Sequence, residues 1–304
     1  EDIQKTTGLL LSSGCTISLI NAVRNMLTSL SWGRLAIRIH PARLVNLVVN
    51  DYVLKYPMVD KCKRYGPPWG PSVPVNATKS EDIHSALETL RRIGLFEKLP
   101  KLVKEHLQRS DLDTLYLTDD DLRNKGIRVH SFVLSDPQDS AEAAAQVAEK
   151  MGLTPLVVTT SIEGEASEVG TFLAAIATEI VRTGRPVSPP CLVICSGEMT
   201  VTLSSSHGLG GRNQECVLSS ALRIENGHNI VIASIGTDGT DGPTDIAGGI
   251  VDGYTLQRAS EIGMDLREML VTHNSSYALR ALQDAIYFNE PGNNVCDLSM
   301  IIVS

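Results

Sequence analysis

The sequence of 304 residues predicts an α/β protein, because apolar runs of strand length alternate with helix-length segments from about residue 129 onward. The clearest strand is Ile230–Ile235, a run of β-branched and small residues between Asn229 and Gly236. A polar loop, Gly-Thr-Asp-Gly-Thr-Asp-Gly-Pro-Thr-Asp over residues 236–245, follows at once. Such alternation is typical of largely parallel sheets flanked by helices, which bind ligands at strand ends.

The first 128 residues are predicted to form part of a first α/β domain. Thr16 can cap a helix whose apolar residues recur every three or four positions as far as Leu30. The prolines and glycines of residues 61–71 predict a loop. The other elements expected here are a strand over Leu44–Val49, a helix from Ser80 that stops at Gly94, and a helix from Pro100 to about Arg109.

Residues 110–127 are polar and acidic, and they predict a linker or surface excursion. We therefore divide the chain into a domain over residues 1–128 and a second α/β region over residues 129–304. The second region is expected to contain strands at Val129–Leu134, Pro155–Thr160, Cys191–Leu203 (interrupted at Gly197 and Glu198) and Leu298–Val303, with helices at Ser140–Met151, Glu165–Thr183 and Arg212–Ile224.

Composition excludes several classes of function. A net charge of −8, a pI near 5.4 and 4% aromatic residues argue against a nucleic-acid partner. No apolar run approaches the roughly 20 residues of a membrane span, and the acidic start Glu1-Asp2 does not resemble a signal peptide. The six cysteines lack metal-type spacing, and Cys191 and Cys195 are expected to pack as small hydrophobic residues. We expect a cytoplasmic protein.

The loop over residues 236–245 is the first candidate binding element. It places three carboxylates and several backbone N–H groups at the end of a strand, where a ligand can be held. The alternative is an acidic surface turn, since glycine and aspartate favour turns in any case.

The second candidate is Gly208-Leu-Gly-Gly-Arg-Asn-Gln-Glu215, a glycine-rich loop that leads into a helix. Helix N-termini attract anions, and Arg212 adds a planar fork that matches phosphate or carboxylate. The loop matches neither the Walker A nor the dinucleotide glycine pattern. The alternative is an ordinary capped helix with a solvated arginine.

Glu198 interrupts an apolar strand next to Gly197, a position where glycine often marks the close approach of a ligand or another backbone. Its carboxylate can ligate a metal, orient a hydroxyl group or face water. Together the two loops, Arg212 and these carboxylates favour binding of a phosphorylated ligand or transfer of a phosphoryl group with a divalent cation.

The two loops, extended to Gly208–Glu215 and Gly236–Gly253, resemble the glycerate 2-kinase family with a C-terminal MOFRL domain. The MOFRL core is expected at about residues 190–304. Shorter segments that also resemble the family are Leu19–Arg24, Gly33–Ala36, Gly70–Pro74, Ser161–Gly170, Gly197–Thr200 and Gly292–Val295.

The resemblance implies transfer of phosphate from ATP to the 2-hydroxyl of glycerate with Mg²⁺, in a cleft between two α/β domains. It implies catalytic roles for Arg212, which would stabilise charge on the transferring group, and for Asp238. The residues assigned to substrate or phosphate binding are Glu198, Gly210, Gly211, Asn213, Thr237, Thr240, Asp241 and Asp245. The partners expected are glycerate and a nucleotide.

The chain departs from the family in its first part. The family's N-terminal Gly-Lys-Ala motif, whose lysine is implicated in catalysis, and its Ser-Gly-Gly-Gly-Ser loop are not in this sequence, so the first domain is expected to be truncated. Ser31–Ala36 also replaces the usual Lys-Gly-Gly-Arg-Leu-Ala. The alternative function is a catalytically inactive fragment or pseudoenzyme. A nicotinamide-dependent reductase is disfavoured because the dinucleotide fingerprint is missing.

Overall fold

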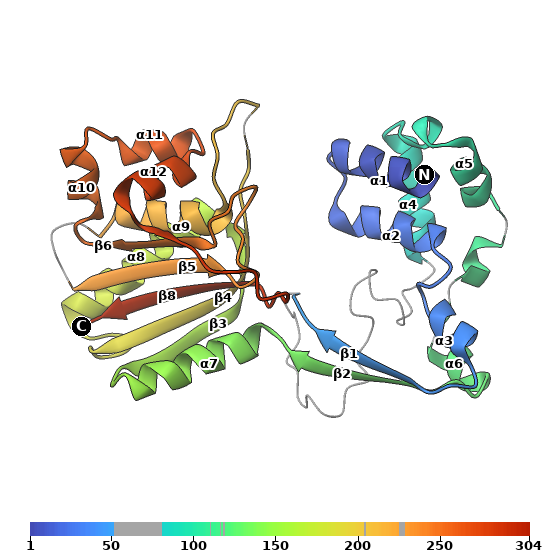
Figure 1. The fold of residues 1–304 in the computed structure, drawn as a ribbon, viewed down its shortest axis with the longest axis horizontal. Coiled ribbons are helices and arrows are strands. Elements are labelled where there is room, and N and C mark those ends of the chain that lie inside the picture. The colour runs from blue at the N-terminus through green and yellow to red at the C-terminus, as the bar shows by residue number, and fades with distance from the viewer. Residues whose placement is uncertain (52–80, 110, 116, 118, 204, 225–228) are drawn as a thin grey trace. The chain divides into compact units, whose positions relative to one another are not determined.

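The computed structural model describes residues 1–51 and 81–304, apart from 110, 116, 118, 204 and 225–228 (Figure 1). The chain divides into two compact units, Glu1–Leu47 with Asp60–Phe132, and Val48–Val59 with Val133–Ser304. The loop predicted at residues 61–71, the family-like turn at 70–74 and the predicted helix start at Ser80 lie outside the described residues.

The first unit is built from helices around one apolar core. Thr16 caps the second helix as predicted, since its hydroxyl accepts the N–H of Leu19 at 3.4 Å. Leu10, Leu90 and Leu107 are among the fully buried residues that join these helices. The helical elements are α1 Asp2–Ser12, α2 Ile17–Leu27, α3 Arg34–Ile39, α4 Glu81–Arg92, α5 Lys101–Leu107 and α6 Asp119–Asn124, with 3-10 turns at Phe96–Lys98 and Leu112–Leu115.

The linker predicted over residues 110–127 is instead partly helical. It contains the turn Leu112–Leu115 and α6, and it buries Leu122 and Ile127 against Ala36. Its polar composition reflects exposed faces of short helices. The predicted strands at β1 (Leu44–Val49) and β2 (Val129–Ser135) are confirmed, and they pair in a two-stranded sheet.

The second unit contains a six-stranded sheet in the order β3-β4-β8-β5-β6-β7. The α/β class is confirmed, whereas parallel pairing holds only for β3 and β4 among the pairings of this sheet. The strands are β3 Thr154–Glu165, β4 Cys191–Thr200, β5 Ile230–Gly236, β6 Gly248–Asp252, β7 Ala285–Ile286 and β8 Asp297–Val303.

The antiparallel pairings have a simple origin. The strands that helices connect, β3, β4 and β5, do run in the same direction, as the alternation predicts. The last strand, β8, inserts between β4 and β5 and runs antiparallel to both. Hydrophobic periodicity reveals which segments are strands but not where the terminal strand joins the sheet.

Helices cover both faces of this sheet (Figure 1). On one face Ala141 and Ala148 of α7 pack against Leu192 and Ile194, whereas the alternate residues of β4 face α8 and α9 on the other. Cys191 and Cys195 are buried on that second face as predicted. The helices are α7 Pro137–Lys150, α8 Ala166–Thr183, α9 Arg212–Ala221, α10 Thr255–Glu261, α11 Leu266–Val271 and α12 Ser275–Leu282.

Strand β4 runs unbroken through the predicted interruption at Gly197 and Glu198. Gly197 has a φ of 154°, and a Cβ placed there would lie 2.2 Å from the carbonyl oxygen of Ile162 in β3. The glycine therefore permits the close approach of another backbone. Of the two explanations offered for a glycine in this strand, a nearby ligand or a nearby backbone, the structure supports the second. In the part of the chain that the structure describes, no helix has the length and apolarity to cross a bilayer.

Candidate active site

The residues of the candidate site lie at the carboxyl ends of β4 and β5. Asp297, the first residue of β8, pairs with Gly197 near the carboxyl end of β4 and with Gly236 at the end of β5. Helix α9 begins at Arg212 and faces this edge. Residues far apart in the sequence are thus brought together by the insertion of β8.

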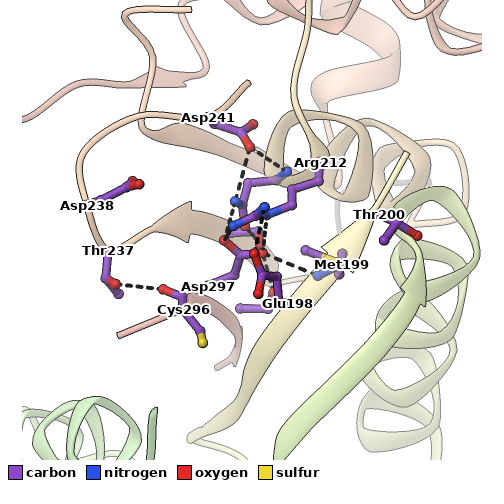
Figure 2. Close-up of polar contacts among 12 residues, drawn as sticks. Glu198, Met199, Thr200, Arg212, Thr237, Asp238, Asp241, Cys296 and Asp297 are labelled. Atoms are coloured by element: carbon purple, nitrogen blue, oxygen red, sulfur yellow. Dashed lines mark hydrogen bonds and ion pairs between the residues drawn. The ribbon is translucent and has the colours of Figure 1, made fainter. Parts of the chain in front are cut away.

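Arg212 is held by two carboxylates (Figure 2). Its Nε and Nη2 donate to the two oxygens of Asp297 at 2.7 and 3.0 Å. Its Nη1 lies 3.2 Å from Oε1 of Glu198. The side chain of Asp297 is 3% exposed and that of Glu198 is 46% exposed, so Arg212 links a buried carboxylate to an accessible one.

Asp241 caps helix α9 from the loop after β5. Its carboxylate accepts the backbone N–H groups of Asn213 and Gln214 at 3.1 and 2.9 Å, as an N-cap side chain does. A Cβ at Gly211 would lie 2.4 Å from Oδ2 of Asp241, so only glycine permits this approach. The helix N-terminus predicted to bind an anion therefore binds a carboxylate of the chain itself.

Asn213 joins the two buried aspartates. Its side-chain amide donates to Oδ1 of Asp297 at 2.9 Å and to Oδ1 of Asp241 at 3.2 Å. Its Oδ1 accepts the hydroxyl of Ser234 at 2.6 Å, and that hydroxyl lies 2.7 Å from the hydroxyl of Ser299. Asn213 is fully buried, so the structure places it behind Arg212 as a connecting residue.

Burial and pairing shift the pKa values of the cluster in different directions. Burial raises the pKa of Asp241, and the N–H groups of Gln214 and Asn213 oppose that rise. Burial also raises the pKa of Glu198, against the effect of the nearby Arg212. For Arg212 burial alone lowers the pKa, but the hydrogen bonds and charge of Asp297 outweigh it and raise the pKa. Arg212 is therefore a permanent cation.

The other predicted residues of the 236–245 loop make different contacts. The hydroxyl of Thr237 donates to the carbonyl of Cys296 at 2.6 Å, which ties the loop to the segment before β8. Asp238 is half-buried and accepts the N–H of Thr240 at 3.0 Å. Asp245 is exposed and pairs with Arg280 of α12, so its described contact lies outside the Arg212 cluster.

A cavity of about 360 Å³ lies beside Arg212. Gly210 and Gly211 form part of its wall, and a Cβ at Gly210 would lie 2.2 Å from the hydroxyl of Ser275. Apolar and ionisable side chains complete the lining, among them Met199, Leu203, Arg212, Glu215, Pro243 and His273. A cavity with a few polar groups in an apolar wall is suited to a small organic ligand.

The carboxylates of the site differ in their capacity to bind a metal. Each oxygen of Asp241 and Asp297 already accepts hydrogen bonds, whereas Glu198 and Asp238 remain partly accessible. No group of three or more histidine, cysteine, aspartate or glutamate residues suited to a metal occurs among the described residues. This donor set fits an ion such as Mg²⁺, which commonly takes one or two carboxylates and completes its shell with phosphates and water.

Asp297 is the site residue that sequence reasoning missed. The strand prediction began at Leu298, one residue too late, and left the aspartate in a loop. Two signals were available: the acidic residue at the start of an apolar strand, and the serines Ser234 and Ser299 within buried strands, which need polar partners. Only the pairing of β8 with β4 and β5 shows that these residues meet Arg212.

Two family models match the chain. The MOFRL family matches residues 191–297, which include β4, α9, β5 and the Arg212 cluster. A domain of unknown function, DUF4147, matches residues 1–108.

Among the curated relatives, a glycerate 2-kinase of Pyrococcus horikoshii is 37% identical over 305 aligned residues, which cover 100% of this chain and 66% of the relative. A D-glycerate 2-kinase of Thermotoga maritima is 36% identical, with 98% of this chain and 66% of the relative covered. A crystal structure of a glycerate kinase from Thermotoga maritima matches with a TM-score of 0.78 and 33% identity, covering 100% of this chain and 67% of that one. The chain thus spans about two thirds of the length of the curated relatives it matches.

Proposed function

We propose that this chain, which belongs to the glycerate kinase family, transfers the terminal phosphate of ATP to the 2-hydroxyl of glycerate. The observation that carries the proposal is the Arg212 cluster, a guanidinium fixed at the carboxyl ends of β4 and β5 beside a cavity of about 360 Å³. Phosphoryl transfer depends on fixed positive charge and positioning, which such a group supplies.

In this proposal Arg212 acts through the edge of its guanidinium that Asp297 does not occupy. Nη1 lies 3.2 Å from the accessible Glu198, and Arg212 is one of the residues that line the cavity. A phosphoryl oxygen placed there would accept a charge-assisted hydrogen bond that strengthens as negative charge develops. Arg212 would therefore lower the barrier more than it tightens binding of the substrates.

The charge of the cluster supports a requirement for Mg²⁺. Arg212 is one cation against the two carboxylates Asp297 and Glu198, and Asp241 adds a third negative group at the α9 N-terminus. The polyphosphate of ATP would be repelled by this arrangement unless a further cation balanced it. Glu198 is the carboxylate that would hold Mg²⁺, and the ion would neutralise charge on the phosphates.

Asp238 is the group that would accept the proton of the glycerate hydroxyl. The N–H of Thr240 holds one of its oxygens at 3.0 Å, which fixes the direction of the carboxylate. A positioned carboxylate within hydrogen-bond reach of an attacking hydroxyl is the usual arrangement in kinases. The half-buried position of Asp238 in the loop after β5 is compatible with this role.

The test is release of ADP from Mg·ATP, measured with and without D-glycerate. We expect release that depends on D-glycerate and that falls about 10³-fold in Arg212→Ala, the order of magnitude for a transition-state arginine. The phosphorylated product should be the 2-phosphate, which coupling to a 2-phosphoglycerate-dependent enzyme distinguishes from the 3-phosphate.

The alternative of a catalytically inactive relative finds no support in the comparisons, since relatives at 36–37% identity over the chain are named as glycerate kinases. It would be favoured if the folded chain released no ADP under any of these conditions. Undiminished release in Arg212→Ala would instead remove that residue from the mechanism.

A further inference from the structure

The carboxylate of Asp297 has its hydrogen-bonding capacity filled by the protein. Oδ1 accepts from Nη2 of Arg212 at 3.0 Å and from Asn213 at 2.9 Å, while Oδ2 accepts from Nε of Arg212 at 2.7 Å and from the N–H of Met199 at 3.4 Å. The residue is 2% exposed. Asp297 is therefore unable to contact a substrate without giving up these partners.

The sheet fixes Asp297 from both sides. Its neighbours in the paired strands are Gly197 and Gly236, and its carbonyl accepts the hydroxyl of Ser196 at 2.8 Å. Directly opposed residues of adjacent strands place their side chains on the same face. Because both neighbours are glycines, no flanking side chain occupies that space, and Arg212 and Asn213 fill it.

The pairing restricts the guanidinium to one orientation. Two parallel N–H···O bonds hold the plane of an arginine, which a single contact does not. Asp297 takes Nε and Nη2 and leaves Nη1 toward the accessible Glu198. The buried carboxylate thus determines which edge of Arg212 a ligand can meet.

We propose that Asp297 is the positioning residue of Arg212 for phosphoryl transfer, an inference that rests on the proposed function. Asp297 acts by holding the guanidinium plane so that Nη1 meets the transferring group. Displacement of a reacting or stabilising group by about 1 Å can cost about 10²-fold in rate. Loss of Asp297 should therefore lower kcat and leave the KM values for ATP and D-glycerate within a few-fold.

The experiment is a double-mutant cycle in the full chain. Asp297→Asn should lower kcat about 10²-fold, and Asp297→Asn combined with Arg212→Ala should be no slower than Arg212→Ala alone. A merely structural aspartate would lower turnover further in the double variant, and that result would overturn the proposal. So would full kcat in Asp297→Asn when Arg212→Ala is inactive. Full kcat in Arg212→Ala would instead refute the role proposed for Arg212.

The matched control is Asp284→Asn. The side chain of Asp284 is 12% exposed, and both of its oxygens accept Nη2 of Arg258 at 2.8 Å. Loss of this carboxylate therefore removes a comparable ion pair just before β7. This control should keep wild-type kcat. An equal loss of kcat in both variants would show that general destabilisation is the cause and would overturn the positioning role.

Two further arms keep the test decisive if Asp297→Asn does not fold or turnover is too slow to measure. Arg212→Lys keeps the charge without the planar fork and should lose kcat to a similar extent; full activity in this variant would overturn the proposal. In nitrogen-15 spectra the Nε–H signal of Arg212, assigned by its loss in Arg212→Ala, should exchange slowly with water in the wild type. An unchanged signal in Asp297→Asn would contradict a restraint by Asp297.

Discussion

Two arginines of the second unit have nearly the same ion-pair chemistry but lie at opposite ends of the sheet. Arg212, 31% exposed, contacts the buried Asp297 and the accessible Glu198. Arg258, 35% exposed, contacts Asp284, which is 12% exposed, and Asp252, which is 38% exposed. Each arginine thus joins one buried carboxylate to one accessible carboxylate.

The surroundings of the two pairs differ. Asp297 lies beside Gly236 at the carboxyl end of β5, and Asp252 lies beside Val231 at the other end of that strand. Arg212 borders the cavity and the glycine loop, whereas Arg258 also contacts Thr255 within its own helix at 3.0 Å. In the proposed function the ion pair at the carboxyl end of β5 serves catalysis, and the pair at the other end of that strand serves stability.

The largest expected difference between the two arginines is in turnover. Arg212→Ala should lower kcat about 10³-fold because it removes charge stabilisation of the transferring group. Arg258→Ala should keep kcat within about a factor of two, because Arg258 does not line the cavity and its partner Asp252 lies at the other end of β5. Steady-state ADP release from both variants, measured below their unfolding temperatures, checks this difference. Comparable losses of kcat would remove the distinction between the two arginines.

The free energy of unfolding should fall by a similar amount in Arg212→Ala and Arg258→Ala. Each substitution leaves a buried aspartate without its cation, and breaking a buried pair costs about 3 kcal/mol. Both arginines are about one third exposed, so water relieves part of that cost. Urea unfolding should therefore give similar losses for Arg212→Ala and Arg258→Ala. A stable Arg212→Ala beside a strongly destabilised Arg258→Ala would show that Asp297 is not a buried charge.

The glycine at the start of α9 offers a smaller effect. A Cβ at Gly211 would overlap the carboxylate of Asp241, so Gly211→Ala should displace the cap and cost about 2 kcal/mol. Gly8 lies within α1, where an added Cβ would meet no atom within 4 Å, and Gly8→Ala should stabilise the chain by up to about 1 kcal/mol. Thermal unfolding should show a lower Tm for Gly211→Ala and a higher Tm for Gly8→Ala. Equal shifts would mean that the Asp241 cap adapts.

The smallest expected effect is a change of pH dependence at Glu215. Burial raises the pKa of Glu215, against its hydrogen bond with His273 at 2.9 Å. The folded state then holds this proton to a higher pH than the unfolded state, so the free energy of unfolding should fall as pH rises from 4.5 through the raised pKa. In Glu215→Gln this part of the decline should be missing. Parallel stability profiles of the wild type and the variant would contradict the shift.

Much of the fold follows from the sequence because its strands are short apolar runs bounded by glycine, proline or asparagine. Ile230–Ile235 and Leu44–Val49 are strands as predicted, and Thr16 caps α2. The pairing of β8 between β4 and β5 could not be predicted, because strand order depends on contacts between segments about 60 to 110 residues apart.

The dependence on contacts between distant segments also explains which site residues were missed. The glycine loop and the 236–245 loop were recognised because each has a local signature. No local pattern indicates that Asp241 caps α9 or that Arg212 pairs with Asp297, since each contact joins separate segments. The direct roles predicted for Arg212, Asp238 and the binding residues remain predictions.

The most direct test of the division between the two arginines is the affinity for a transition-state analogue, Mg·ADP with aluminium fluoride and D-glycerate. Calorimetry should give tight binding to the wild type and to Arg258→Ala, and binding weaker by about 10² to 10³-fold for Arg212→Ala. Equal affinity in all three proteins, or equal weakening in both variants, would contradict a catalytic role confined to Arg212.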